Sequence, residues 1–340
     1  MKAVTPVIAL VMLMLITVGI VGVSAAWFNA VFSSNTKNTI LIPVGGAYCA
    51  NSEIRVYALN PGDTTITSTD ILVADVDGTS VLNSPFFGDM SGALVMYWKF
   101  DEALGSVASD SSGSGNDGTL IGNPIRESGK VNKALRFDGT LANYVAKSSF
   151  PNFPASEITA MFWMKTSDNT KAGTPISYAS SSSSNDFLIY DYRNFYIGIK
   201  DNSLAGQSVT TGVSANDGQW HHIATTWKSA GGETKLYKDG VPAFPGATVS
   251  SGVAMTNGGT LIVAQEQDSV WTAPGGGVFD VTQAFLGTLD EVKIYNKATG
   301  TVSINPGKSG LLIDYPANSG KHSLRIGTSS GVSETSVTCA

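Results

Sequence analysis

The sequence is poor in charge and has no cluster of basic residues. Asp, Glu, Lys and Arg make up 14% of the 340 residues, and 21 basic against 27 acidic side chains give a net charge of −6. A nucleic-acid-binding protein needs a basic patch or stripe against the phosphate backbone. The sequence therefore disfavours nucleic acid as a partner.

Cysteine and histidine are scarce as well. The chain has two cysteines, Cys49 and Cys339, and three histidines, His221, His222 and His322. No Cys-x-x-Cys pair occurs, so a structural zinc site is not expected. The cysteines are either two buried thiols or one disulfide, and an extracellular location favours the disulfide.

Signatures of catalysis are few. The sequence contains no His-Glu-x-x-His motif and no phosphate-binding loop. Glycosidases place two carboxylates across the scissile bond of a sugar, yet no Glu-x-Asp-x-Glu strand is present. We therefore predict that the protein is not an enzyme.

The longest apolar stretch opens the chain. Residues 3–36 contain no Asp, Glu, Lys or Arg, and about 20 apolar residues suffice to cross a bilayer as a helix. We predict a hydrophobic helix over 3–36 that starts in the cytoplasmic membrane. The run is longer than the apolar core of a signal peptide, although residues 23–25 fit a secretory cleavage site and a plain membrane anchor also fits.

The residues around this stretch resemble a known family. Residues 2–10, Lys-Ala-Val-Thr-Pro-Val-Ile-Ala-Leu, are followed by aliphatic residues and then by Ala25-Ala26-Trp27-Phe28, and the whole is similar to the N-terminus of archaeal type IV pilins. The resemblance implies cleavage of a leader, residues 1–2, between Lys2 and Ala3. It also implies a helical filament in which copies of the chain pack through residues 3–36. A mature protein that begins at Ala3 supports the pilin, and one that begins at Ala26 supports secretion.

Beyond residue 36 the pattern is that of a β protein. Short alternating runs are bounded by Gly, Asn, Asp and Pro, which is typical of strands and turns. Residues 37–90 and 301–340 each hold too few strands to close a core, so we predict that they form one split β-sandwich, which a Cys49–Cys339 bond would join. Residues 91–300 are then an inserted domain whose end strands pair, because adjacent termini make insertion tolerable. Three consecutive domains are the alternative.

Three runs in the insert carry a second resemblance. Leu135–Gly139, Gly218–Ser229 and Leu289–Val292 are similar to laminin G-like and pentraxin jelly rolls, with a departure at Ala224, where pentraxins have a cysteine. The predicted fold class is therefore mainly β, with a long N-terminal hydrophobic α-helix, a small split β-sandwich head and an inserted jelly roll.

A further segment resembles the calcium loop of pentraxins. It comprises residues 265–269 and 275–283. The resemblance implies that calcium is bound by the following residues: Glu266 and Asp268 through carboxylates, Gln267 through its main-chain carbonyl, and Asp280 and Gln283 through further oxygens. Calcium takes six to eight hard oxygen ligands in a flexible geometry, so the donor set is suitable. Solvated loop carboxylates are the alternative.

A second calcium segment matches less well. Asn185 fits the family pattern, but Ser184 stands where pentraxins have an aspartate, and Asp186 is the neighbouring substitute. Whether one or two ions bind is left open. Tyr190 falls where pentraxins place an apolar contact to the ligand, whereas Asp138 and Asp290 are expected to have structural roles.

These features predict the structural subunit of an extracellular, type IV pilus-like filament. It would display a calcium-dependent module that binds a surface glycan or an anionic ligand in adhesion. One alternative is a membrane-anchored or secreted calcium-dependent lectin that does not polymerise. Another is a purely structural filament.

Overall fold

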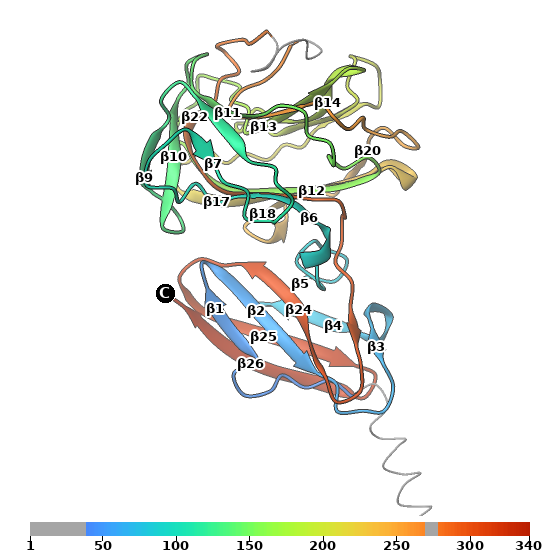
Figure 1. Ribbon diagram of the computed structural model, residues 1–340. Coiled ribbons are helices and arrows are strands. Elements are labelled where there is room, and N and C mark those ends of the chain that lie inside the picture. The colour runs from blue at the N-terminus through green and yellow to red at the C-terminus, as the bar shows by residue number, and fades with distance from the viewer. Residues whose placement is uncertain (1–38, 269–277) are drawn as a thin grey trace, which may run out of the picture.

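Two hydrophobic cores form in the computed structural model, which describes residues 39–268 and 278–340. The larger core draws its side chains from residues 95–294, and the smaller combines residues 40–87 and 302–339 with Met161, Ala224 and Tyr237. Figure 1 shows the resulting two bodies, the smaller of which contains both the blue and the red ends of the described chain.

The larger body is a jelly roll of two antiparallel sheets. The nine-stranded sheet contains, in spatial order, β19 (Val241–Pro242), β18 (Glu233–Lys238), β17 (Trp220–Lys228), β12 (Glu157–Lys165), β22 (Leu286–Tyr295), β10 (Lys133–Asp138) and β9 (Ile125–Ser128), with β20 (Ala247–Thr248) beside β18 and β6 (Leu94–Trp98) beside β22. The eight-stranded sheet contains β16 (Ser208–Thr210), β15 (Tyr196–Ile199), β14 (Ser183–Tyr190), β13 (Ile176–Ser180), β21 (Thr260–Val263), β11 (Tyr144–Lys147), β8 (Gly118–Ile121) and β7 (Val107–Ala108).

Aromatic side chains fill the space between these sheets. Trp98, Trp227 and Tyr178 are fully buried. The indole N–H of Trp98 donates to the carbonyl of Asn116, and that of Trp227 donates to the carbonyl of Val249, both at 2.8 Å. Large rings are therefore buried without an unpaired polar atom on either indole.

The smaller body is completed by strands from both ends of the described chain. Its sheets are β1 (Ala47–Ala50), β2 (Glu53–Leu59) and β24 (Ser309–Pro316); β26 (Gly331–Cys339), β25 (Gly320–Thr328), β4 (Val73–Val76) and β5 (Thr79–Ser80); and β23 (Ser303–Ile304) with β3 (Ile66–Thr67). An early strand pairs with a late one in each sheet, β2 with β24, β4 with β25 and β3 with β23. Neither half can thus satisfy its backbone hydrogen bonds alone. The domain limits predicted from the sequence remain predictions.

The two cysteines form the predicted disulfide. Cys49 in β1 is bonded to Cys339 in β26, with an S–S distance of 2.01 Å across 290 residues of sequence. The bond therefore joins the first and last strands of the smaller body.

The chain leaves the smaller body and returns to it at a single place. Asp89 and Thr301 form an antiparallel bridge, with N···O distances of 2.9 and 3.1 Å. A Cβ atom on Gly88 would lie 2.9 Å from backbone atoms of Gly300 and Thr301, and Gly88 has a φ of 83°. Glycine is needed here because the two connecting segments touch and because a side chain disfavours this φ. Beyond the bridge, β6 pairs with β22.

The face of the jelly roll nearest the smaller body is packed against it. The ring of Phe86 makes edge contacts with His222 and Tyr237 of the jelly roll and with Tyr315 of β24. The hydroxyl of Tyr315 donates to the carbonyl of Asp239 at 3.2 Å. This contact explains why β12 and β17 are buried along almost their whole length rather than on alternate residues.

The predicted fold class is wrong in its helical part. Residues 39–268 and 278–340 contain strands and three short 3-10 turns, Ser68–Asp70, Ser91–Ala93 and Ala230–Gly232, and no α-helix. The physical reason is that apolar residues in this part recur with the period of a strand. No helix in these ranges has the length and apolar character needed to span a bilayer. The helix over 3–36 and the cleavage site at Lys2 and Ala3 lie outside the described residues.

Removal of the disulfide should destabilise the smaller body. Replacing both cysteines, Cys49→Ser with Cys339→Ser, should lower the free energy of unfolding by about 2–5 kcal/mol, because the bond restricts the unfolded chain. Chemical denaturation of the full chain measures the loss, and reduction of the unmodified protein should reproduce it. Ser336→Ala, an exposed position in β26, is the matched control. Equal stability of the double variant and this control would contradict the expectation.

Candidate functional site

The candidate site lies where β21 leaves the eight-stranded sheet. Residues 264–267 continue from β21 and are buried. Ala264 has a φ of 75°, an unusual value for a residue with a side chain, so the backbone changes direction here. The amide of Asp268 then donates to the carbonyl of Val278 at 2.8 Å. This hydrogen bond joins the two parts of the first predicted calcium segment, residues 265–269 and 275–283.

Glu266 is a buried carboxyl group with an unused oxygen. Its residue is 1% exposed, and its Oε2 atom has no hydrogen-bond partner among the described residues. Its Oε1 atom lies 2.7 Å from a terminal amide atom of Asn185 in β14. With the amide nitrogen at that position Asn185 donates to Glu266, whereas with the oxygen there two acceptors face each other and need either a proton on Glu266 or a cation between them.

Burial and acidic neighbours disfavour the ionised form of Glu266. Burial raises the pKa of Glu266 to about 8, and the carboxylates of Asp268 and Asp280 add to this rise. The structure therefore brings these three acids into one electrostatic neighbourhood. Without a cation, Glu266 is held largely protonated at neutral pH.

Asp268 and Asp280 are more accessible than Glu266. Asp268 is exposed and Asp280 is half-buried. The amide of Thr282 donates to Asp280 Oδ1 at 2.8 Å and lowers the pKa of that carboxyl group. Asp280 is thus readily ionised and held in a defined turn.

The two glutamines that were predicted to bind calcium have different surroundings. The Gln267 side chain is fully buried and donates through Nε2 to Ser177 Oγ and to the Thr260 carbonyl, both at 3.1 Å. It ties β21 to β13, which leaves the main-chain carbonyl for the role that the resemblance implies. The side-chain Oε1 of Gln283 is buried and lacks a partner in the described part of the chain.

Asp186 does not replace the missing aspartate of the second calcium segment. It is fully buried, 3.2 Å from Lys200 Nζ, and accepts a hydrogen bond from the amide of Thr256 at 3.2 Å. Successive side chains of a strand point to opposite faces, so Asp186 lies on the face opposite Asn185. The interpretation of Asp186 as a substitute ligand was wrong.

Tyr190 lies at the end of the same strand. Its half-buried ring makes an edge contact with Tyr196 at 5.3 Å between centroids. Burial raises the pKa of the Tyr190 phenol, and Glu266 is among the charges that contribute. Tyr190 therefore flanks the acidic group.

Asp138 and Asp290 bind backbone amides, in line with structural roles. Asp138 accepts from the amide of Thr140 at 3.0 Å, and Asp290 accepts from the amide of Val131 at 2.9 Å. Asp290 is fully buried, its Oδ1 atom has no hydrogen-bond partner among the described residues, and burial raises its pKa to about 8.

The acidic side chains of the described residues do not form a complete metal site by themselves. Within 39–268 and 278–340, no group of three or more His, Cys, Asp or Glu side chains is placed to hold a metal ion. A site here would have to add amide and main-chain oxygens to the acids, which is normal for calcium.

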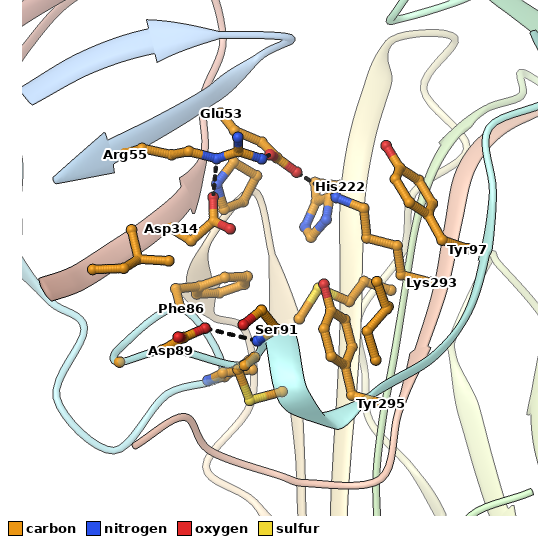
Figure 2. A pocket seen from close by; sticks show the side chains of 17 residues that line it. Glu53, Arg55, Phe86, Asp89, Ser91, Tyr97, His222, Lys293, Tyr295 and Asp314 are labelled. Atoms are coloured by element: carbon orange, nitrogen blue, oxygen red, sulfur yellow. Dashed lines mark hydrogen bonds and ion pairs between the residues drawn. The ribbon is translucent and has the colours of Figure 1, made fainter. Parts of the chain in front are cut away.

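Two features were not recognised in the sequence. Residues 327–331 match Gly-x-Ser-x-Gly, but the serine of a hydrolase lies at a strand-to-helix turn, whereas Ser329 lies in the hairpin between β25 and β26. The second feature is a polar pocket between the two bodies (Figure 2). The signal for this pocket in the sequence was the presence of charged residues within the otherwise apolar strand β22.

Comparison with known proteins identifies the fold of the larger body. A family profile described as the concanavalin A-like lectin/glucanases superfamily matches residues 138–305. The sushi, von Willebrand factor type A, EGF and pentraxin domain-containing protein 1 of Rattus norvegicus is 38% identical over 41% of this chain and 4% of its own length. Neuronal pentraxin-2 of Homo sapiens is 32% identical over 44% of this chain and 33% of its own. The chain thus spans a minor part of these relatives.

A solved structure of a heptameric SAP-like pentraxin from Limulus polyphemus is also similar. It is 20% identical, covers 54% of this chain and 94% of its own, and has a TM-score of 0.37, too low to carry an argument. The profile and the relatives support a laminin G-like and pentraxin-like jelly roll, as predicted. The resemblance to archaeal pilins receives no support from these comparisons, and its residues lie outside the described part of the chain.

The raised pKa of Glu266 should make the metal-free protein sensitive to pH. Folded Glu266 keeps its proton up to about pH 8, against 4.5 ordinarily, so the folded state binds more protons between these values. The free energy of unfolding should therefore fall as the pH rises from about 4.5 to 8. Glu266→Gln should flatten this decline and stabilise the protein by roughly 2–4 kcal/mol at pH 8.

Denaturation in a chelator at several pH values measures this effect. Glu334→Gln, a change at an exposed residue of β26, should retain the decline. The interpretation fails if Glu266→Gln and Glu334→Gln have parallel stability profiles.

Proposed function

We propose that the jelly roll is a calcium-dependent binding module for glycans or anionic surface groups. The observation that carries the proposal is the buried carboxyl group of Glu266. It has an unused oxygen, lies beside Asn185 and is surrounded by Asp268 and Asp280. A buried, unpaired carboxylate is costly unless a proton or a cation compensates it.

The donor set fits calcium better than softer metals. The candidate ligands are carboxylate, amide and main-chain oxygens, which hard cations prefer. Glu266, Asp268 and Asp280 would supply negative charge, and Asn185, Gln267 and Gln283 would supply neutral oxygens. Calcium bound there would offer open coordination positions to hydroxyl pairs or anionic oxygens of a ligand. Tyr190 would provide an apolar contact beside it.

A binding role fits the described residues better than a filament role. The larger body is lectin-like and pentraxin-like, whereas filament assembly rests on residues 3–36. The disulfide favours an oxidising location, so we place the binding module outside the cell. Catalysis has no comparable support, because the nearest catalytic motif lies in a hairpin.

Calcium should stabilise the full chain. Extracellular calcium modules bind with dissociation constants of about 0.1–1 mM, so ~10 mM calcium should add about 1.4–2.7 kcal/mol. The melting temperature should rise by roughly 3–10 °C. Titration calorimetry should detect binding, and Asp268→Asn should remove most of the heat and of the temperature shift.

The matched control is Asp63→Asn, since Asp63 is an exposed acid of the smaller body. It should respond to calcium like the unmodified protein. Absence of both heat and stabilisation in the unmodified protein would overturn the calcium site. Binding to immobilised glycans or anionic lipid vesicles then tests the ligand class, with loss expected in a chelator and in Asp268→Asn but not in Asp63→Asn.

A further inference from the structure

A pocket lies between the two bodies, away from the predicted calcium residues. It encloses about 170 Å³. Its walls come from β2 and β24 of the smaller body, from β6, β17 and β22 of the jelly roll, and from the connecting residues 85–91. Figure 2 shows side chains of both bodies turned toward this space.

The charges along one wall neutralise one another. Glu53 accepts from Lys293 Nζ at 2.5 Å and from Arg55 Nη2 at 2.7 Å. Arg55 Nε lies 3.4 Å from Asp314 Oδ1. These two cations and two carboxylates form a continuous chain of ion pairs (Figure 2). A ligand that binds here is therefore not required to supply a compensating charge, which favours a neutral one.

His222 lines the pocket through its ring. His222 is 7% exposed, and its Nδ1 atom has no hydrogen-bond partner among the described residues. Its ring lies between Phe86 and Lys293 (Figure 2). Burial, together with the charge of Lys293, lowers the pKa of His222 to about 3, so the ring is neutral. The Nδ1 atom itself is enclosed, so the ring adds neither a charge nor a reachable polar atom to the pocket.

The remaining walls are apolar and partly aromatic. Phe86, Tyr97 and Tyr295 line the space together with methionine, leucine and proline side chains. Aromatic rings provide flat apolar surface with a negative face, which suits the C–H groups of a sugar ring. The volume equals that of roughly six water molecules, which suits one monosaccharide unit and excludes a long oligosaccharide.

We propose that this pocket is a second, calcium-independent binding site for a neutral monosaccharide unit or a polyol of similar size. Ligand hydroxyl groups would pair with the donors and acceptors of the ion-pair chain. The apolar face of the ligand would rest on the aromatic wall. The site is independent of the calcium module, so either can fail without the other.

Ligand-detected NMR of the full chain in a chelator tests this proposal. The probes are methyl glycosides of neutral hexoses and N-acetylhexosamines, with glycerol as the small polyol. At least one methyl glycoside should show saturation transfer, and an excess of the same sugar should compete it away.

A pair of neighbouring variants tests whether the sugar occupies the pocket. Ser91 lines the pocket and is exposed, so Ser91→Trp should abolish binding by obstruction. Gly92 is outside the lining and has open space around its Cβ position, so Gly92→Trp should bind normally. Asp268→Asn should also bind normally in the chelator.

Three results would each overturn the proposal. They are absence of transfer to every glycoside, equal binding by Ser91→Trp and Gly92→Trp, and binding that requires calcium. The last result would assign the sugar to the calcium module instead.

Discussion

The architecture depends on the close contact between the two segments that connect the bodies. Asp89 and Thr301 pair through their backbones, and the contact between Gly88 and Gly300 leaves no room for side chains. Because the larger body begins and ends at this point, it can occupy the middle of the sequence without separating the halves of the smaller one. The sheets of the smaller body cannot form until its last strands are available, so contacts between residues close in sequence cannot complete its fold.

The acidic residues near β21 illustrate how a stable sheet can hold an unstable charge. The buried amide group of Gln267 fixes the backbone beside Glu266 through hydrogen bonds to two strands. The protein therefore keeps a carboxyl group where either a proton or a cation must accompany it. This is the physical basis for assigning binding to this end of the jelly roll.

Part of the structure could be predicted from residue patterns. The end strands of the insert were predicted to pair, and β6 and β22 do so in the structure. The two cysteines and an expected extracellular location favoured one disulfide. The proximity of Glu266, Asp268 and Asp280 followed from a family resemblance rather than from spacing. Metal binding by these residues remains a prediction.

Other features depend on tertiary contacts that sequence patterns do not encode. The position of Asp186 could not be predicted, because its role depends on Lys200 reaching it from a neighbouring turn. The interdomain pocket could not be predicted either, since its lining combines residues 53–55, 222, 293 and 314 from both bodies. The predicted fold class was wrong in its long helix, which was inferred from residues outside the described range, whereas its mainly β part matches the strands of the described residues.

The disulfide has a topological consequence that differs from its effect on folding. Cys49 and Cys339 enclose nearly every described residue in one covalent ring. A protease that cuts one peptide bond anywhere between them opens the ring but releases no fragment. The jelly roll would thus stay tethered to the smaller body after a first cleavage, and two cuts are needed to shed it.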